Sequence, residues 1–151
     1  MNARSAIATS LITTVLALAA LAGCATPEGN AAAYRDEALS TLKAAHSAVE
    51  SVHITVSARL QDKVFGRSAD DAVSLASESL SGTAGTFVGL QPPRGADKVR
   101  EAATKLLSDA QDAVDAARIA VRRGDRHGMR QANDEVARAS QALDRADQEL
   151  P

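Results

Sequence analysis

Apolar residues recur every three or four positions along most of the chain after residue 30, with polar residues between them. The first stripe follows Asn30, a suitable N-cap, and continues to about Lys63. Its members are Ala38, Leu42, Ala45, Val49, Val52, Val56, Leu60 and Val64. This spacing places apolar side chains on one face of an α-helix. The pattern therefore predicts a long amphipathic helix that begins after residue 30.

A second stripe follows Gly66, which we expect to end the first helix in a left-handed conformation. Ser68 followed by Asp71 resembles an N-terminal capping box with the shorter acid. The stripe consists of Val73, Ser77, Leu80, Ala84 and Phe87. Gly82 and Gly85 interrupt it, and each costs about 1 kcal/mol relative to Ala in a helix. We expect this helix to be the least stable one, with small residues that would allow a close backbone approach.

Two further stripes follow the segment GLQPPRG at residues 89–95, whose glycines and prolines oppose a helix. The third stripe ends at Gly124 and the fourth is capped by Asp125. They consist of Val99, Ala103, Leu106, Ala110, Ala113, Ala117 and Ala120, and of Met129, Ala132, Val136, Ala139, Leu143, Ala146 and Leu150. No segment alternates with period two over a useful length, so the chain is predicted to be all-α.

Four amphipathic helices with short connections favour an antiparallel up-down-up-down four-helix bundle over residues 31–151. An elongated three-helix arrangement with a frayed second helix is the alternative. In the antiparallel topology the start of the first helix, the Pro-rich segment and the C-terminus share one end. The turns near Gly66 and Gly124 share the other end.

The chain before residue 30 has a different character. Arg4 is followed by residues 6–23, which contain no charged residue and are rich in Leu, Ile, Val and Ala. That layout is typical of a secretory signal peptide. Threonines and a serine interrupt the run, whereas a permanent membrane span needs about 20 strongly apolar residues. A cleaved leader is therefore the favoured interpretation.

The leader ends in Leu21-Ala22-Gly23-Cys24, which resembles the lipobox of bacterial lipoproteins. The resemblance implies transfer of diacylglyceryl to the Cys24 sulfur and cleavage between Gly23 and Cys24. Residues 1–23 would then be the signal peptide and residues 24–30 a tether. Each buried acyl methylene contributes about 0.8 kcal/mol to membrane binding, so we expect a lipid-anchored protein on the extracytoplasmic face of the cell membrane. An ordinary signal peptide with an incidental cysteine is the alternative.

Composition narrows the classes of partner. Residues 24–151 contain 16 Lys and Arg against 19 Asp and Glu, a net charge of −3 that does not favour nucleic acid. Tyr34, Phe65 and Phe87 are the only aromatic residues, which disfavours stacking sites for single strands. The chain is similar in general character to small Ala-rich lipoproteins of high-GC Gram-positive bacteria, a resemblance that implies no particular activity. Its oligomeric state is left open.

Basic residues gather around the turns expected at the end far from Cys24. They are Arg59, Lys63 and Arg67 near the first turn, and Arg118, Arg122, Arg123, Arg126 and Arg130 near the second. One interpretation is that they offset helix dipoles. The other is a surface that meets an acidic envelope protein or an anionic wall polymer. Charge reversal at Arg122, Arg123 and Arg126 would then leave stability nearly unchanged but abolish the binding of the partner. The Arg-Gly-Asp sequence at residues 123–125 is explained by helix capping.

Glu50-Ser51-Val52-His53 resembles the Glu-x-x-His element of di-iron bundles. His46 lies two turns before His53, but the second such element is absent from the sequence. A surface metal site of His46, Glu50 and His53 is one interpretation, and solvated flank residues are the other. No cofactor is expected, and no catalytic motif is found. The sequence thus predicts a non-catalytic binding, spacer or scaffold module, with a metal- or small-ligand-binding bundle as the alternative.

Overall fold

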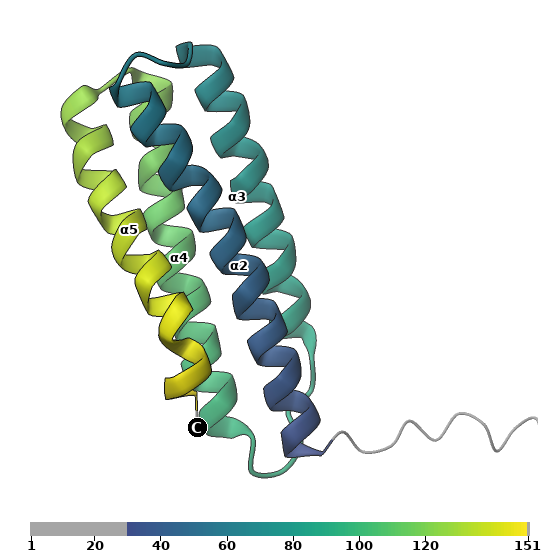
Figure 1. Cartoon of the computed structure of the whole chain (residues 1–151). Helices are drawn as coiled ribbons and strands as arrows, with labels where there is room; N and C mark the ends of the chain where they lie inside the picture. The colour runs from purple at the N-terminus through teal and green to yellow at the C-terminus, as the bar shows by residue number, and fades with distance from the viewer. Residues whose placement is uncertain (1–29, 151) are drawn as a thin grey trace, which may run out of the picture.

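A computed structural model of the chain describes residues 30–150, which form four helices. They are α2 (Ala31–Leu60), α3 (Gly66–Gly89), α4 (Asp97–Arg123) and α5 (Arg126–Glu149) (Figure 1). No strand occurs within this range, and the expected all-α class is confirmed. Gly23 and Cys24, with the predicted leader and cleavage site, lie outside the described residues. Within residues 30–150 no helix combines the length and the hydropathy that crossing a membrane requires.

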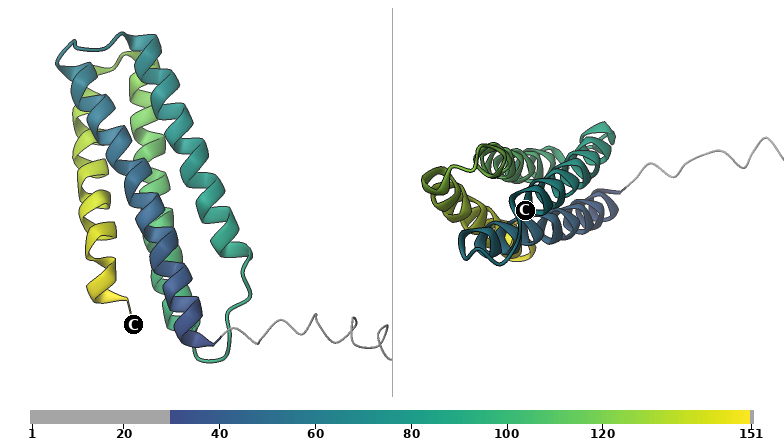
Figure 2. Two further views of the ribbon diagram at one scale, coloured as in Figure 1. Left: turned by 45° about the vertical axis from the view of Figure 1, so that its right-hand side comes forward. Right: turned by 90° about the horizontal axis from the view of Figure 1, so that it is seen from above.

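The connections between helices gather at two ends of the bundle. The α2–α3 and α4–α5 turns lie at one end, and the start of α2, the α3–α4 connection and the end of α5 lie at the other (Figures 1 and 2). Near the start of α2, the rings of Tyr34 and Phe87 have centroids 5.5 Å apart. At the opposite end, Arg126 of α5 donates a hydrogen bond to the carbonyl of Leu60 over 2.6 Å. Both ends are therefore closed by residues far apart in the sequence.

A single apolar core runs between the helices and follows most of the predicted stripes. The buried members of the α2 stripe are Ala38, Leu42, Ala45, Val49, Val52 and Val56. Leu60 and Val64, at the end of that stripe, are only partly buried. The period of the sequence pattern therefore identifies the inner face of α2.

Three predicted core positions are wrong by one residue. Ser77, Leu106 and Ala139 are half-buried, whereas their neighbours Ala76, Leu107 and Ser140 are buried. An α-helix has 3.6 residues per turn, so a strict three–four alternation drifts by about 20° in seven residues. The residue that faces the core then changes to an adjacent one.

The end of α2 also differs from the prediction. The helix ends at Leu60 rather than near Lys63, and Asp62 adopts a left-handed conformation with φ of 57°. Asp is one of the few side chains that enter this region, because it can form local hydrogen bonds. Here its carboxylate accepts hydrogen bonds from Arg59 over 3.2 Å and from Arg126 over 3.1 Å. Contacts from the end of α2 and from the start of α5 therefore meet at this carboxylate.

The prediction that Gly66 ends the first helix is also wrong. Gly66 is the first residue of α3 and does not end α2. Ser68 and Asp71 lie inside the helix, so they form no capping box. The N-cap is Phe65, whose side chain makes no capping hydrogen bond.

Three predicted helix termini are confirmed. Asn30 caps α2 by accepting a hydrogen bond from the backbone of the first turn over 2.7 Å. Gly124 ends α4 with φ of 65°, a conformation that favours glycine. Asp125 then caps α5 by accepting two backbone hydrogen bonds of 3.0 Å.

The second helix is continuous, contrary to the alternative with a frayed segment. α3 passes through Gly82 and Gly85 without interruption. A Cβ atom built at either glycine would meet no atom within 4 Å. The two glycines therefore do not serve a close approach of neighbouring helices within the bundle.

The break predicted at residues 89–95 is confirmed by the connection that joins α3 to α4. Arg100 of α4 donates hydrogen bonds to the carbonyls of Leu90 over 2.7 Å and Val88 over 3.0 Å. These two bonds hold the connection against the first turn of α4.

Candidate functional site

Residues 59–71 and 118–130 form the end of the bundle that we call the basic end. It contains eight Lys and Arg against four Asp, a formal charge of +4. The rest of residues 30–150 contains eight basic against fourteen acidic residues, a formal charge of −6. The two turns of the basic end lie together at the end opposite to the start of α2 (Figure 1). The fold thus separates charge along the bundle.

Of the basic residues predicted to face a partner, the five arginines near the second turn are Arg118, Arg122, Arg123, Arg126 and Arg130, and three of them are held by contacts within the chain. Arg118 pairs with Asp115 over 3.3 Å, Arg122 with Asp70 over 3.4 Å, and Arg126 with Asp62 over 3.1 Å. The last two pairs join different helices or turns. Charge reversal at Arg122 and Arg126 would break them, so it is expected to lower stability, contrary to the expectation from sequence.

The other two arginines, Arg123 and Arg130, are exposed, as are Lys63 and Arg67. Among the described residues, none of these four cations has an ion pair or a side-chain hydrogen bond within the chain. They come from both turns of the basic end. Their charges are therefore available to an anionic partner.

Phe65 adds an apolar group to the basic end. Its exposed fraction is 85%, whereas the other phenylalanine, Phe87, is 1% exposed in the core. Lys63 and Arg67 lie two residues before and after it. Aromatic residues and arginine are enriched in protein–protein interfaces.

The sequence pattern did not predict that Phe65 belongs to the basic end. One signal was present in the sequence. Phe65 follows Val64, the last member of the first stripe, and belongs to neither the first nor the second stripe. An aromatic residue outside both stripes has no predicted place in the core.

The second turn of the basic end is built around Asp125. The N–H of Gly128, and secondarily the N–H of His127, hold the pKa of Asp125 below its ordinary value of 3.8. A Cβ atom at position 128 would lie 2.6 Å from Oδ2 of Asp125, so a side chain there would displace the capping carboxylate from its present position. Capping therefore accounts for Gly124 and Asp125 in the Arg-Gly-Asp sequence.

A shallow groove of about 250 Å³ between α4 and α5 adjoins the basic end. Its lining includes Arg123 and Ile119, whose exposed fraction is 48%. Ile119 and Arg123 therefore extend the surface of the basic end that a partner can contact.

His46, Glu50 and His53 are not brought together as metal ligands. The Glu50 carboxylate accepts a short hydrogen bond from buried Ser140 of α5. Nδ1 of His53 is buried and has no hydrogen-bond partner. Within residues 30–150 no group of three His, Cys, Asp or Glu side chains is placed to hold a metal ion. The α2–α5 contact therefore accounts for Glu50 without a ligand role.

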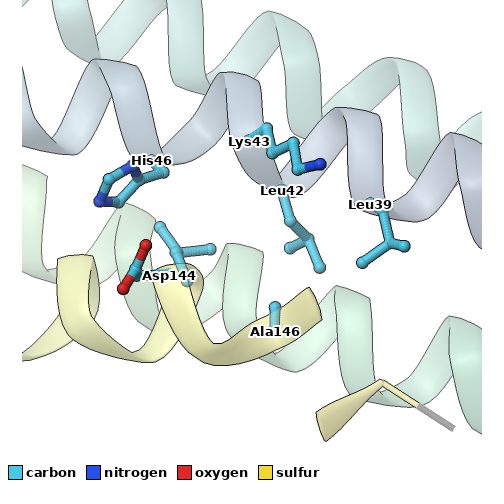
Figure 3. A pocket seen from close by; sticks show the side chains of 7 residues that line it. Leu39, Leu42, Lys43, His46, Asp144 and Ala146 are labelled. Atoms are coloured by element: carbon cyan, nitrogen blue, oxygen red, sulfur yellow. The ribbon is translucent and has the colours of Figure 1, made fainter. Parts of the chain in front are cut away.

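His46 lies apart from this contact, at a small pocket between α2 and α5. Figure 3 shows the His46 ring and the Asp144 carboxylate at this pocket, beside Leu42 and Lys43. Its volume is about 70 Å³, whereas sites for small organic ligands typically measure about 300–1,000 Å³. The pocket is too small for a typical organic ligand.

Gly23 and Cys24, which are predicted for cleavage and lipid attachment, lie outside the described part of the chain. Among the described residues, the exposed cations and Phe65 make the basic end the candidate site. No protein-family model, no curated protein and no solved structure matches the chain.

Proposed function

We propose that the protein is a non-catalytic cell-envelope lipoprotein, anchored by acylated Cys24 to the extracytoplasmic face of the cell membrane. Its helices form an antiparallel up-down-up-down bundle that holds the basic end away from the membrane. The observation that carries this proposal is the position of the start of α2 and of the basic end at opposite ends of the bundle (Figure 1). The lipobox-like Leu21-Ala22-Gly23-Cys24 supports the anchor.

The dimensions suit a spacer. α2 has 30 residues, and a rise of 1.5 Å per residue makes it about 45 Å long. Asn30, the N-cap of this helix, follows Cys24 by six residues, so the tether is short. An anchored bundle would carry its far end about one helix length from the tether.

The partner that suits the basic end is a protein with an acidic surface and an apolar pocket. Lys63, Arg67, Arg123 and Arg130 make no ion pair or side-chain hydrogen bond among the described contacts, and only Arg123 lies close enough to a carboxylate, that of Asp125, to affect its pKa. They can therefore pair with carboxylates of a partner. Phe65 is 85% exposed, so a partner that buries its ring needs an apolar surface. We expect a protein to provide such a surface and an anionic wall polymer not to. Aromatic and arginine side chains contribute most where a partner excludes water from them.

The anchor is tested in bacterial cells that express the full chain and receive an alkyne-bearing fatty acid. The wild-type chain is expected to take up the label and to fractionate with membranes, because Cys24 is its only cysteine. Cys24→Ser is expected to lose the label. An unlabelled wild-type chain that retains residues 1–23 in the cytosol would refute the anchor.

The basic end is tested by crosslinking in intact cells, followed by mass spectrometry of the captured proteins. Phe65→Ser and the double variant Arg123→Glu, Arg130→Glu are expected to lose a partner that the wild type captures. Arg138→Glu, which reverses an exposed arginine elsewhere on α5, is the matched control and is expected to keep the partner. Equal capture by all variants would refute the role of the basic end, and loss of wall polymer instead of protein would assign it to the polymer.

A further inference from the structure

The end of the bundle at the start of α2 also contains the connection between α3 and α4. Figures 1 and 2 show this connection beside the start of α2, at the tip of the bundle. We call residues 30–33 and 88–98 the tether end, because the predicted tether joins the bundle there. It lies opposite to the basic end, so an anchored bundle would bring it close to the lipid bilayer.

The proposed tether limits how far this end can move from the bilayer. Asn30 follows Cys24 by six residues, and an extended chain spans at most about 3.6 Å per residue. The start of α2 would therefore stay within about 22 Å of an acylated Cys24. The polar headgroup layer occupies about 5–8 Å of that distance. With the two surfaces tethered so closely, even a weak contact between them is well populated.

Val88 gives the tether end an exposed apolar side chain. It is 45% exposed, whereas the preceding residue, Phe87, is 1% exposed in the core. The exposed neighbours of Val88, Gly89 and Gln91, are uncharged. An apolar side chain in such a position gains free energy when a bilayer interface removes it from water.

The polar backbone of the connection is held by hydrogen bonds within the bundle. Arg100 donates to the carbonyls of Val88 over 3.0 Å and of Leu90 over 2.7 Å. Two of the nine residues in 88–96 are prolines, which have no N–H group. Burial of a polar group is costly mainly when the group has no hydrogen bond. The bonded carbonyls therefore allow a close approach to a weakly polar surface.

The charges of the tether end suit lipid headgroups. It contains Arg94 and Lys98 against Asp97, a formal charge of +1. Both cations are exposed, and among the described contacts neither makes an ion pair or a side-chain hydrogen bond. Asp97 is in the first turn of α4, where an acid offsets the helix dipole. Arg94 and Lys98 can therefore pair with lipid phosphate groups.

The sides of the bundle have the opposite charge. Residues 30–150 outside the tether end and the basic end contain six basic against thirteen acidic residues, a formal charge of −7. The exposed acids that adjoin the tether end are Asp36, Glu37, Glu101 and Glu149, and the predicted tether contains Glu28. α5, which contains Glu149, ends short of the tip (Figure 1). An anionic bilayer therefore repels the sides of the bundle more than its tether end.

We propose that the tether end rests on the surface of the lipid bilayer, with Val88 among the headgroups and Arg94 paired with lipid phosphate. This inference rests on the proposed anchor at Cys24 and adds a second contact with the same membrane. A flexible tether alone leaves the bundle free to tilt, whereas two contacts at one end hold it upright. The basic end is then kept about one helix length from the bilayer.

The test uses tryptophan fluorescence, because the chain contains no tryptophan. The full chain with Gln91→Trp, at an exposed position of the connection, is purified from bacterial membranes. It is placed in vesicles of phosphatidylglycerol and phosphatidylcholine with brominated acyl chains, which quench tryptophan only at short range. Gln91→Trp is expected to show blue-shifted and quenched emission. Phe65→Trp, at the basic end, is the matched control and is expected to emit as it does in water.

Two further substitutions identify the groups that make the contact. Adding Val88→Ser to Gln91→Trp is expected to weaken the contact on the order of threefold. Adding Arg94→Glu is expected to weaken it on the order of tenfold in these anionic vesicles, and less in phosphatidylcholine alone. Ile119→Ser and Arg138→Glu, at exposed positions of α4 and α5, are the matched controls and are expected to leave the quenching unchanged.

Flotation of the chain with the vesicles separates this contact from the anchor. A chain that carries no acyl group and does not float would overturn both proposals. A chain that floats without quenching at Gln91→Trp would overturn the contact and leave the anchor in place. Equal quenching after Val88→Ser and Arg94→Glu, or quenching of Phe65→Trp, would do the same. Unchanged far-ultraviolet circular dichroism shows that each variant is folded.

Discussion

The guanidinium of Arg126 donates a hydrogen bond of 2.6 Å to the carbonyl of Leu60, across 66 residues of sequence. That carbonyl belongs to the last residue of α2, where backbone oxygens lack a partner within the helix. The same guanidinium reaches the Asp62 carboxylate over 3.1 Å. One side chain therefore satisfies the end of α2 and fixes the start of α5 against it.

Arg126→Ala is expected to lower the free energy of unfolding by about 1 kcal/mol. Hydrogen bonds from charged groups contribute about 1.5–3 kcal/mol when buried, and the 48% exposure of this side chain reduces that value. Urea unfolding measures the change. Arg123→Ala, at an exposed arginine without an intramolecular ion pair, is the control, and equal losses for both variants would contradict the role of the contact.

The cap at Asp125 predicts a dependence of stability on pH. Hydrogen bonds from Gly128 and His127 lower the pKa of this carboxyl in the folded state, while the unfolded chain keeps the ordinary value of 3.8. The stabilisation is therefore complete above the unfolded pKa and disappears as pH falls through the lower folded pKa. Thermal melts of the wild type and Asp125→Asn from pH 7 to below pH 3 should differ most near neutrality and converge in acid. A constant difference would argue against the ionised cap.

Gly82→Ala and Gly85→Ala are each expected to stabilise the protein by about 0.5–1 kcal/mol. Both positions are helical and a Cβ atom there meets open space, so alanine gains helix propensity without a clash. Thermal or urea unfolding would show the increase. Gly128→Ala provides the contrast, since its Cβ would collide with Asp125 and lower stability.

Leu107→Ala is expected to be more destabilising than Leu106→Ala. Leu107 is 1% exposed in the core, whereas Leu106 is only partly buried. Truncation of a buried leucine costs about 2–5 kcal/mol, and the half-buried neighbour should lose less. Urea unfolding of both variants compares them directly, and a larger loss for Leu106→Ala would place the core face of α4 where the sequence pattern put it.

Local features of the sequence were sufficient to locate the four helices and several of their ends. Asn30, Gly124 and Asp125 act where they were predicted to act, because capping depends on residues within one turn. The alternation of apolar and polar residues also placed most of the core, since the period of an α-helix is a local property. At Leu106 and Ala139 the predicted core position is wrong by one residue, because a strict three–four alternation drifts from the 3.6-residue turn of the helix.

The roles of the charged residues depended on contacts that the sequence does not display. Arg126 and Asp62 are 64 residues apart, and only packing of α5 against α2 makes one the partner of the other. Asp62, which accepts the hydrogen bond from Arg126, adopts the left-handed conformation just after the end of α2, and Gly66 begins the next helix instead of ending this one.

By itself the sequence determined an all-α chain of four amphipathic segments, because helix period and capping are encoded within a few neighbouring residues. The tertiary structure decided which cations are used within the fold, that Phe65 is exposed, and that Glu50 faces Ser140 instead of completing a metal site. These outcomes depend on distances between helices, and such distances exist only after the core has packed.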